Sequence, residues 1–126
     1  MPRIDFSSFL RFLEFEKRFS RHTIVAYETD LIQFTDFLLL NYEIDEPMLV
    51  KANMVRSWLV QLVDHKVEPR SINRKISSLK TYFKFLQRQN EIKVNPMLKV
   101  VAPKTSKRLP EFLDERNIQQ GLNLKV

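Results

Sequence analysis

The chain has 126 residues, of which 44% are hydrophobic, and this proportion excludes an intrinsically disordered protein and suits one domain with a short tail. The absence of cysteine excludes disulfides and cysteine-based zinc sites, and no apolar run is long enough to span a membrane. The formal net charge is +6, and a single glycine leaves few of the tight turns that β-hairpins need, which favours helices. Because no signal-peptide segment is evident, we expect a soluble, cytoplasmic protein.

The positive charge is concentrated in one part of the chain. Residues 69–110 hold eleven basic side chains and a single acid, Glu91, which gives this segment a net charge of +10, whereas the remaining ten bases and fourteen acids give −4. Such an uneven distribution of charge is typical of a protein with a surface that binds a polyanion. A solvated lysine and arginine surface is the alternative, and charge alone favours neither.

The first predicted helix covers residues 5–17. Phe6, Phe9, Leu10 and Leu13 recur at the spacing of one helix face, so this helix should bury one side. Asp5 is a plausible N-cap, because its carboxylate can accept a hydrogen bond from an orphan amide at the helix start.

The second predicted helix covers residues 21–41, with Ser20 as its N-cap. Its apolar residues repeat at three- and four-residue steps, and three more on a flank should widen the buried face. The stripe consists of Ile24, Tyr27, Leu31, Phe34 and Leu38. The flank consists of Val25, Ile32 and Leu39.

Two more helices are predicted over residues 53–65 and 70–90. Trp58 lies on the apolar stripe of the third, and Pro69 suits the start of the fourth, where a missing N–H costs nothing. Asn95-Pro96 is expected to end regular structure, with an extended linker over residues 98–110. Four amphipathic helices must bury their stripes against one another, which predicts an all-α, compact bundle.

The fourth predicted helix has two contrasting faces. Apolar residues occupy one side at steps of 4, 3, 4 and 3, and the opposite side is cationic with short polar residues between the cations. Arginine can bind phosphate or the guanine edge, asparagine can pair with adenine, and serine or threonine permits close approach. A solvated face usually mixes acids with bases, whereas this helix contains no acid. This composition favours a helix lying against a DNA major groove.

Several blocks resemble the opening of Xer-type tyrosine recombinases and phage integrases. The first comprises residues 9–14 (FLRFLE) and 20–27 (SRHTIVAY), followed by Asp30-Leu31 and Phe34. The second comprises residues 70–80 (RSINRKISSLK) and 82–86 (YFKFL), followed by Asn95-Pro96 and residues 109–113 (LPEFL). The similarity extends over nearly the whole chain, and its specificity comes from the ordered set of blocks.

The resemblance implies a fold and a function. In that family the N-terminal, core-binding domain is a SAM-like orthogonal bundle of four to five helices. It forms half of a clamp around recombination-site DNA, with its second and fourth helices against the duplex. We therefore expect a DNA-binding module for DNA integration or recombination, with double-stranded DNA and protomers of the same recombinase as partners, and with no cofactor, membrane or small-molecule substrate.

The cationic face and the resemblance together nominate twelve DNA-binding residues. His22 and Thr23 match the start of the second helix and are expected phosphate contacts, Arg74 and Ser77 match best in the fourth helix, and the last three residues match the linker. The set is His22, Thr23, Arg70, Asn73, Arg74, Lys75, Ser77, Thr81, Lys84, Lys104, Lys107 and Arg108.

The resemblance also implies a domain division. Residues 1–100 should form the DNA-binding domain, residues 101–110 a basic linker, and residues 111–126 the shortened start of a catalytic domain or a tail. The Arg, Lys and His residues and the Tyr nucleophile of the family's catalytic segments have no counterpart here. We expect a fragment of a longer tyrosine recombinase without catalytic activity of its own.

Other chemistry finds little support in the residues. His22 and His65 lack partners at metal-ligand spacing, and no tyrosine has a basic cluster with a paired histidine to activate it. Tyr27 falls on an apolar stripe and is expected in the core with its hydroxyl outward. The alternative function is a helical protein-interaction or dimerisation module without DNA binding, with a surface formed by Val25, Ile32, Leu39, Phe12 and Phe15.

Overall fold

Four α-helices and two short 3-10 helices carry the fold in the computed structural model, which describes residues 4–101. No strand occurs within that range, which confirms the all-α prediction. The elements are α1 (Ser7–Phe15), α2 (Arg21–Tyr42), η1 (Pro47–Leu49), α3 (Ala52–Asp64), α4 (Pro69–Arg88) and η2 (Pro96–Lys99).

The starts of α2 and α4 have local causes in the sequence. The Ser20 hydroxyl accepts a hydrogen bond from the Thr23 amide at 3.2 Å, which confirms it as the N-cap of α2. Pro69 occupies the first turn of α4, as predicted. Asp5 accepts a hydrogen bond from the Ser7 amide at 2.9 Å, but α1 begins at Ser7, two residues later than the pattern predicts.

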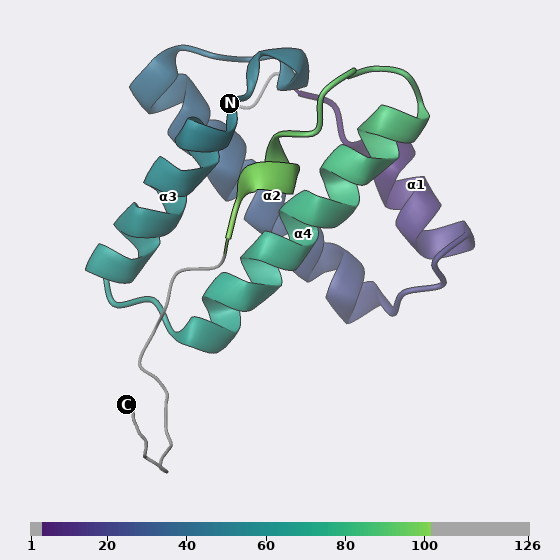
Figure 1. The fold of residues 1–126 in the computed structure, drawn as a ribbon. Coiled ribbons are helices and arrows are strands. Elements are labelled where there is room, and N and C mark those ends of the chain that lie inside the picture. Colours follow the sequence, from purple (N-terminus) through teal and green to yellow (C-terminus); the bar gives the residue numbers. More distant parts are fainter. Residues whose placement is uncertain (1–3, 102–126) are drawn as a thin grey trace, which may run out of the picture.

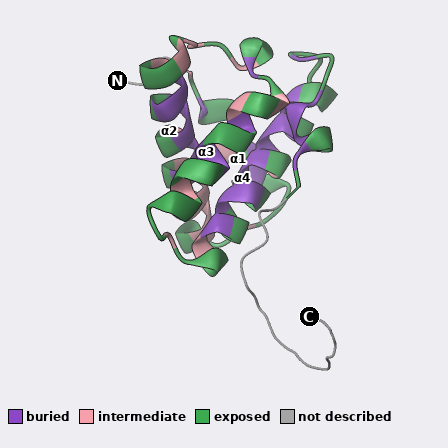
Figure 2. Ribbon diagram, turned by 60° about the vertical axis from the view of Figure 1, so that its left-hand side comes forward, coloured by how far each residue is buried: buried purple, intermediate pink, exposed green. Residues whose placement is uncertain are grey.

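The bundle is arranged around α4. Figure 1 shows α4 crossing the front of the molecule with α2 behind it, and α1 and α3 lie to either side. Buried residues follow one side of α4 and exposed residues the other (Figure 2). Trp58 is 3% exposed and packs on Phe34 with 5.0 Å between ring centroids, which confirms its predicted core position.

The aromatic residues of α1 and α4 form one end of the core. The ring of Tyr82 makes edge-to-face contacts with Phe6 and Phe9, at centroid distances of 5.4 and 5.1 Å. Tyr82 is 4% exposed, and burial raises the pKa of its hydroxyl. Tyr27 is half-buried beside Phe19, at 5.5 Å between centroids.

The segment after α4 differs from the prediction. Regular structure does not end at Asn95-Pro96, because the Asn95 side chain accepts a hydrogen bond from the Met97 amide at 2.9 Å and caps η2. This short helix packs against α3 and α4, and Met97 within it and Val100 directly after it are buried. Residues 98–100 therefore pack as part of the bundle and not as an extended linker, and residues 102–110 of the predicted linker lie outside the described residues.

Candidate nucleic-acid interface

The side of α4 opposite the core is an acid-free surface, called here the α4 face. Arg70, Asn73, Ser77 and Lys84 are exposed along it, and Thr81 is half-buried. The apolar stripe of α4 orients this face, because burial of residues at steps of three and four turns the intervening positions outward. Within residues 4–101, no carboxylate forms an ion pair with Arg70 or Lys84.

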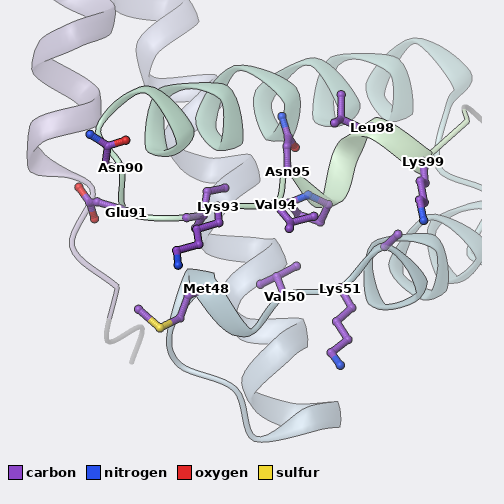
Figure 3. Close-up of a pocket in the computed structure, with 13 residues that line it drawn as sticks. Met48, Val50, Lys51, Asn90, Glu91, Lys93, Val94, Asn95, Leu98 and Lys99 are labelled. Carbon is purple, nitrogen blue, oxygen red and sulfur yellow. The ribbon is translucent and has the colours of Figure 1, made fainter.

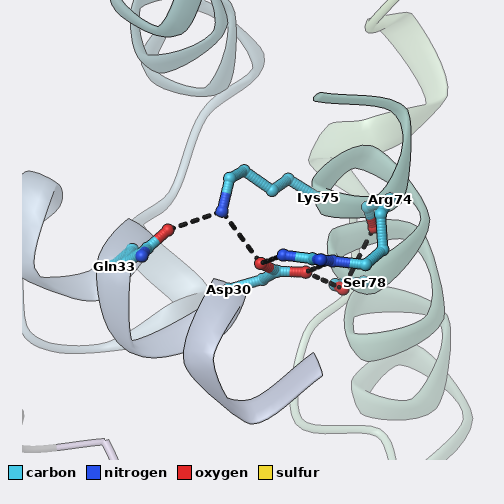
Figure 4. Close-up of polar contacts among 5 residues, drawn as sticks. All are labelled: Asp30, Gln33, Arg74, Lys75 and Ser78. Atoms are coloured by element: carbon cyan, nitrogen blue, oxygen red, sulfur yellow. Dashed lines mark hydrogen bonds and ion pairs between the residues drawn. The ribbon is translucent and has the colours of Figure 1, made fainter. Parts of the chain in front are cut away.

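The inner edge of the α4 face is joined to α2 by a buried carboxylate. Asp30 is 0% exposed and accepts two hydrogen bonds from the Arg74 guanidinium, at 3.0 Å from Nε and 2.7 Å from Nη2. The Lys75 amine donates to Asp30 at 2.9 Å and to Gln33 at 2.6 Å, and the Ser78 hydroxyl donates to Asp30 at 2.8 Å. Figure 4 shows these side chains converging from the two helices.

The surrounding donors keep Asp30 ionised. Burial by itself would raise the pKa of this carboxyl, but hydrogen bonds from Arg74, Lys75 and Ser78 outweigh burial and hold the pKa below the ordinary value. The same contact with Asp30 raises the pKa of Arg74. The buried charge is therefore both neutralised and hydrogen-bonded, as a stable buried ion pair requires.

Arg74 and Lys75 occupy different environments although they are adjacent. The Arg74 side chain is 44% exposed, so its guanidinium borders the α4 face while Asp30 fixes its orientation. The Lys75 side chain is only 8% exposed, and its amine points toward α2. The structure thus separates Lys75 from the other predicted contacts on α4.

The predicted contacts of α2 lie at its N-terminal end. His22 is exposed and Thr23 is half-buried, with the Thr23 hydroxyl 3.0 Å from that of Ser20. The Thr23 amide donates to Ser20, whereas the first amides of a helix generally have no partner within the helix and favour anions. The predicted linker contacts Lys104, Lys107 and Arg108 lie outside the described residues.

Sequence reasoning missed the role of Asp30. It recognised this residue only as part of a family-like block, although a lone acid on the apolar stripe of a helix signals a buried cationic partner. Lys75 also lies 300° around the helix from Ile72 at 100° per residue, close to the apolar side. Together these two positions could have predicted the pairing.

A second surface feature lies away from the α4 face. An apolar groove of about 670 Å³ is formed by the connection into α3, around Met48 and Val50, and by the chain after α4, around Val94 and Leu98 (Figure 3). Val94 and Leu98 are 79% and 77% exposed. The flank proposed from sequence is divided, since Phe15 is 66% exposed but Phe12 is part of the core.

Two further features are absent from the part of the chain that the structure describes. No helix there has the length and apolar character needed to cross a bilayer. The same residues contain no group of three or more histidine, cysteine or acidic side chains placed to hold a metal ion.

Comparison with known proteins gives consistent matches. The family described as "Phage integrase, N-terminal SAM-like domain" matches residues 6–90. The tyrosine recombinase XerD of Rickettsia bellii is 35% identical over 116 residues, covering 92% of this chain and 37% of the relative. The tyrosine recombinase XerC of Halalkalibacterium halodurans is 38% identical over 117 residues, covering 93% of this chain and 38% of the relative.

The length relationship is the same in a third relative. The tyrosine recombinase XerC of Staphylococcus aureus is 35% identical over 112 residues, which is 89% of this chain and 37% of that protein. The chain thus spans less than two fifths of the length of these relatives. No solved structure matches it. With a helical bundle over residues 4–101 and a family match over residues 6–90, the chain belongs to the phage integrase N-terminal SAM-like domain family.

Proposed function

We propose that this domain binds double-stranded DNA through the α4 face and the start of α2, as the DNA-binding module of a site-specific tyrosine recombinase. The observation that carries the proposal is the α4 face itself, an exposed surface of cations and short polar side chains without an acid. A duplex carries one negative charge per roughly 1.7 Å of axis, so a continuous cationic surface of this kind is electrostatically complementary to it.

The proposed contacts divide by chemistry. Arg70 and Lys84 would bind phosphates, and Asn73 and Ser77 are short enough to approach the base edges. Asp30 already fixes one edge of Arg74, so the Arg74 Nη1 group would contact the DNA. The proposed set on the two helices is His22, Thr23, Arg70, Asn73, Arg74, Ser77, Thr81 and Lys84.

Lys75 has another role in this proposal. Its amine is engaged by Asp30 and Gln33, and moving it to the DNA would leave a buried carboxylate less well paired. We propose that Lys75 joins α2 to α4 and thereby sets the relative position of the two DNA-binding helices. Lys104, Lys107 and Arg108 remain proposed backbone contacts of a basic linker.

The biological role follows from the relatives. Their names identify them as tyrosine recombinases, and we propose that this domain holds one side of a recombination site during DNA integration or recombination. We propose that the residues that cleave DNA belong to a catalytic part of the parent recombinase and not to this domain.

The test is fluorescence anisotropy of a labelled duplex of about 30 base pairs, measured between 50 and 200 mM salt. If five to eight phosphates are contacted, the slope of log K against log[salt] should be about −5 to −7. The double variant Arg70→Glu/Ser77→Glu should lose binding, because it places two carboxylates on the α4 face.

The matched control is Lys51→Glu/Gln61→Glu, which makes the same change in net charge at exposed positions of the α3 region. It should retain most of the affinity. Failure of the unaltered protein to bind at 50 mM salt, or equal losses in the two variants, would reject the α4 face as the DNA-binding surface.

A second candidate function is self-association. The apolar groove near Val94 and Leu98 favours it, because exposed apolar patches on a small domain mark protein contacts. Its proposed occupant is a second copy of this chain, whose own exposed Val94 and Leu98 side chains would provide a matching apolar surface. Sedimentation should then give a concentration-dependent mass that Leu98→Glu abolishes, and a constant monomer mass would reject this function.

A further inference from the structure

A hollow of about 330 Å³ lies between the end of α1 and the C-terminal half of α4. Most of its lining residues were not among the predicted DNA contacts. The cations Lys17, Lys80, Lys84 and Arg88 and the Thr81 side chain surround it, with Phe12 and Phe85 as apolar lining. We refer to it as the four-cation hollow.

Packing fixes part of its wall. Phe12 and Phe85 are each 8% exposed, and their ring centroids lie 4.9 Å apart. The guanidinium carbon of Arg88 lies 5.5 Å from the centroid of the Phe12 ring, a cation–π contact. The Phe12 ring accepts no conventional hydrogen bond, so the guanidinium keeps N–H donors that can bind an anion.

The charges of the hollow are uncompensated. Lys80, Lys84 and Arg88 follow one another at four-residue steps, so their side chains are neighbours on one side of α4 and repel one another. None of the lining residues is acidic. Within residues 4–101, none of the four cations forms an ion pair with a carboxylate. An anion in the hollow would relieve this repulsion.

We propose that the four-cation hollow binds a phosphate of the DNA backbone at the edge of the groove that α4 enters. Lys84 lies seven residues beyond Ser77, or about 10 Å along the helix. The major groove is about 12 Å wide. If Asn73 and Ser77 lie inside the major groove, the hollow lies beside the DNA strand that forms one edge of that groove. The inference rests on the proposed DNA-binding function and adds Lys17, Lys80 and Arg88 to the interface.

The test variant is Lys17→Gln/Lys80→Gln, which removes two cations whose side chains are exposed and outside the core. The control is Lys51→Gln/Lys93→Gln, which makes the same change in charge at exposed positions that do not line the hollow. Thermal melts compare the folding of both variants with that of the unaltered protein. Anisotropy is then measured on two duplexes of unrelated sequence between 50 and 200 mM salt.

Loss of one phosphate contact reduces the magnitude of the salt slope by about 0.9. The affinity deficit of Lys17→Gln/Lys80→Gln is the ratio of the association constant of the unaltered protein to that of the variant. This ratio should therefore fall by about 3.5-fold between 50 and 200 mM salt. The deficit should be the same for both duplexes, because a phosphate carries no sequence information. The control should keep the slope of the unaltered protein.

The outcomes separate the two proposals. If the unaltered protein binds and Lys17→Gln/Lys80→Gln keeps its slope and affinity, the phosphate site is wrong and the α4 face stands. A deficit on only one duplex also overturns the phosphate assignment, since it indicates a base contact. Absence of salt-dependent binding by the unaltered protein overturns the proposed function and the phosphate site with it.

Discussion

At the scale of single residues, Asp30 explains most about the candidate interface. One carboxylate holds Arg74, Lys75 and Ser78, and it thereby orients a guanidinium at the border of the α4 face while connecting α2 to α4. Helical phase predicted that Arg74 is exposed, because phase depends only on sequence position. It did not predict that Arg74 is paired, because the partner is 44 residues away in the chain.

Replacing the carboxylate should destabilise the domain strongly. In Asp30→Asn the Lys75 amine stays in a largely buried position without its anion, and loss of one partner of a buried pair typically costs about 3–5 kcal/mol. Urea denaturation at pH 7 measures this difference in the free energy of unfolding. The control Asp36→Asn changes an exposed acid of the same helix and should cost less than about 0.5 kcal/mol.

The pH dependence follows from the lowered pKa of Asp30. A carboxyl with a depressed folded-state pKa contributes stability that is fully present above its unfolded value, 3.8 here, and is lost as the pH falls through the folded value. The stability difference between Asp30→Asn and the unaltered protein should therefore be constant near neutral pH and narrow below about pH 4. A difference that stays constant down to pH 2 would contradict the ionised pair.

At the scale of elements, the four α-helices were predictable with ends within two residues of those observed, whereas the short helix after α4 was not. The four apolar stripes predicted the four α-helices, and Ser20 and Pro69 predicted two starts within one residue. The chain after α4 was misjudged, because η2 is stabilised by burial of Met97 and Val100 against other helices. A four-residue helix of this kind leaves no periodicity in the sequence.

The helix ends show one unusual shared property. The chain reverses after each α-helix through a residue other than glycine in the left-handed region, namely Arg18, Glu43, Lys66 and Asn90, with φ between 56° and 62°. After α3 the Val67 amide donates to the Leu62 carbonyl at 3.0 Å, the hydrogen bond of a Schellman-type end. Such ends usually contain glycine, because a Cβ is disfavoured in that conformation.

Glycine at this position should therefore stabilise the domain. Lys66→Gly removes the steric cost of a Cβ in the left-handed conformation, roughly 1–2 kcal/mol. It also increases the conformational entropy of the unfolded state, which lowers the stability by about 0.5–1 kcal/mol. The expected net gain is about 0.5–1 kcal/mol, measured by urea denaturation. His65→Gly is the matched control, since His65 has φ −86° and should only lose stability. Destabilisation by both substitutions would show that Lys66 is not strained.

At the scale of the whole molecule, the domain presents two surfaces of opposite character. The α4 face is cationic and continues into the four-cation hollow, whereas the groove near Val94 and Leu98 is apolar. Charge counting predicted the first surface, because eleven bases fall between residues 69 and 110. The second surface was not predicted, because it is formed by η1, the start of α3 and the chain after α4, which tertiary packing brings together.

Sequence position predicted which residues of α4 are exposed, but not the contacts that depend on packing between helices. Of the nominated residues on α4, Arg70, Asn73, Ser77 and Lys84 are exposed as helical phase predicts. The inward turn of Lys75 and the contribution of α1 to the four-cation hollow depend on the packing of helices far apart in sequence. Resemblance to recombinases named the fold, but it did not reveal these contacts.

The most direct test of the central claim is to map the DNA-bound surface by nuclear magnetic resonance. The ¹⁵N-labelled chain is titrated with a duplex of about 15 base pairs at low salt, and the amide shift changes are located in the structure. If the α4 face is the interface, the largest amide shift changes should occur at the exposed positions between Arg70 and Arg88 and near Thr23. Changes centred on Met48, Val94 and Leu98, with α4 unaffected, would contradict it and identify the apolar groove as the binding surface.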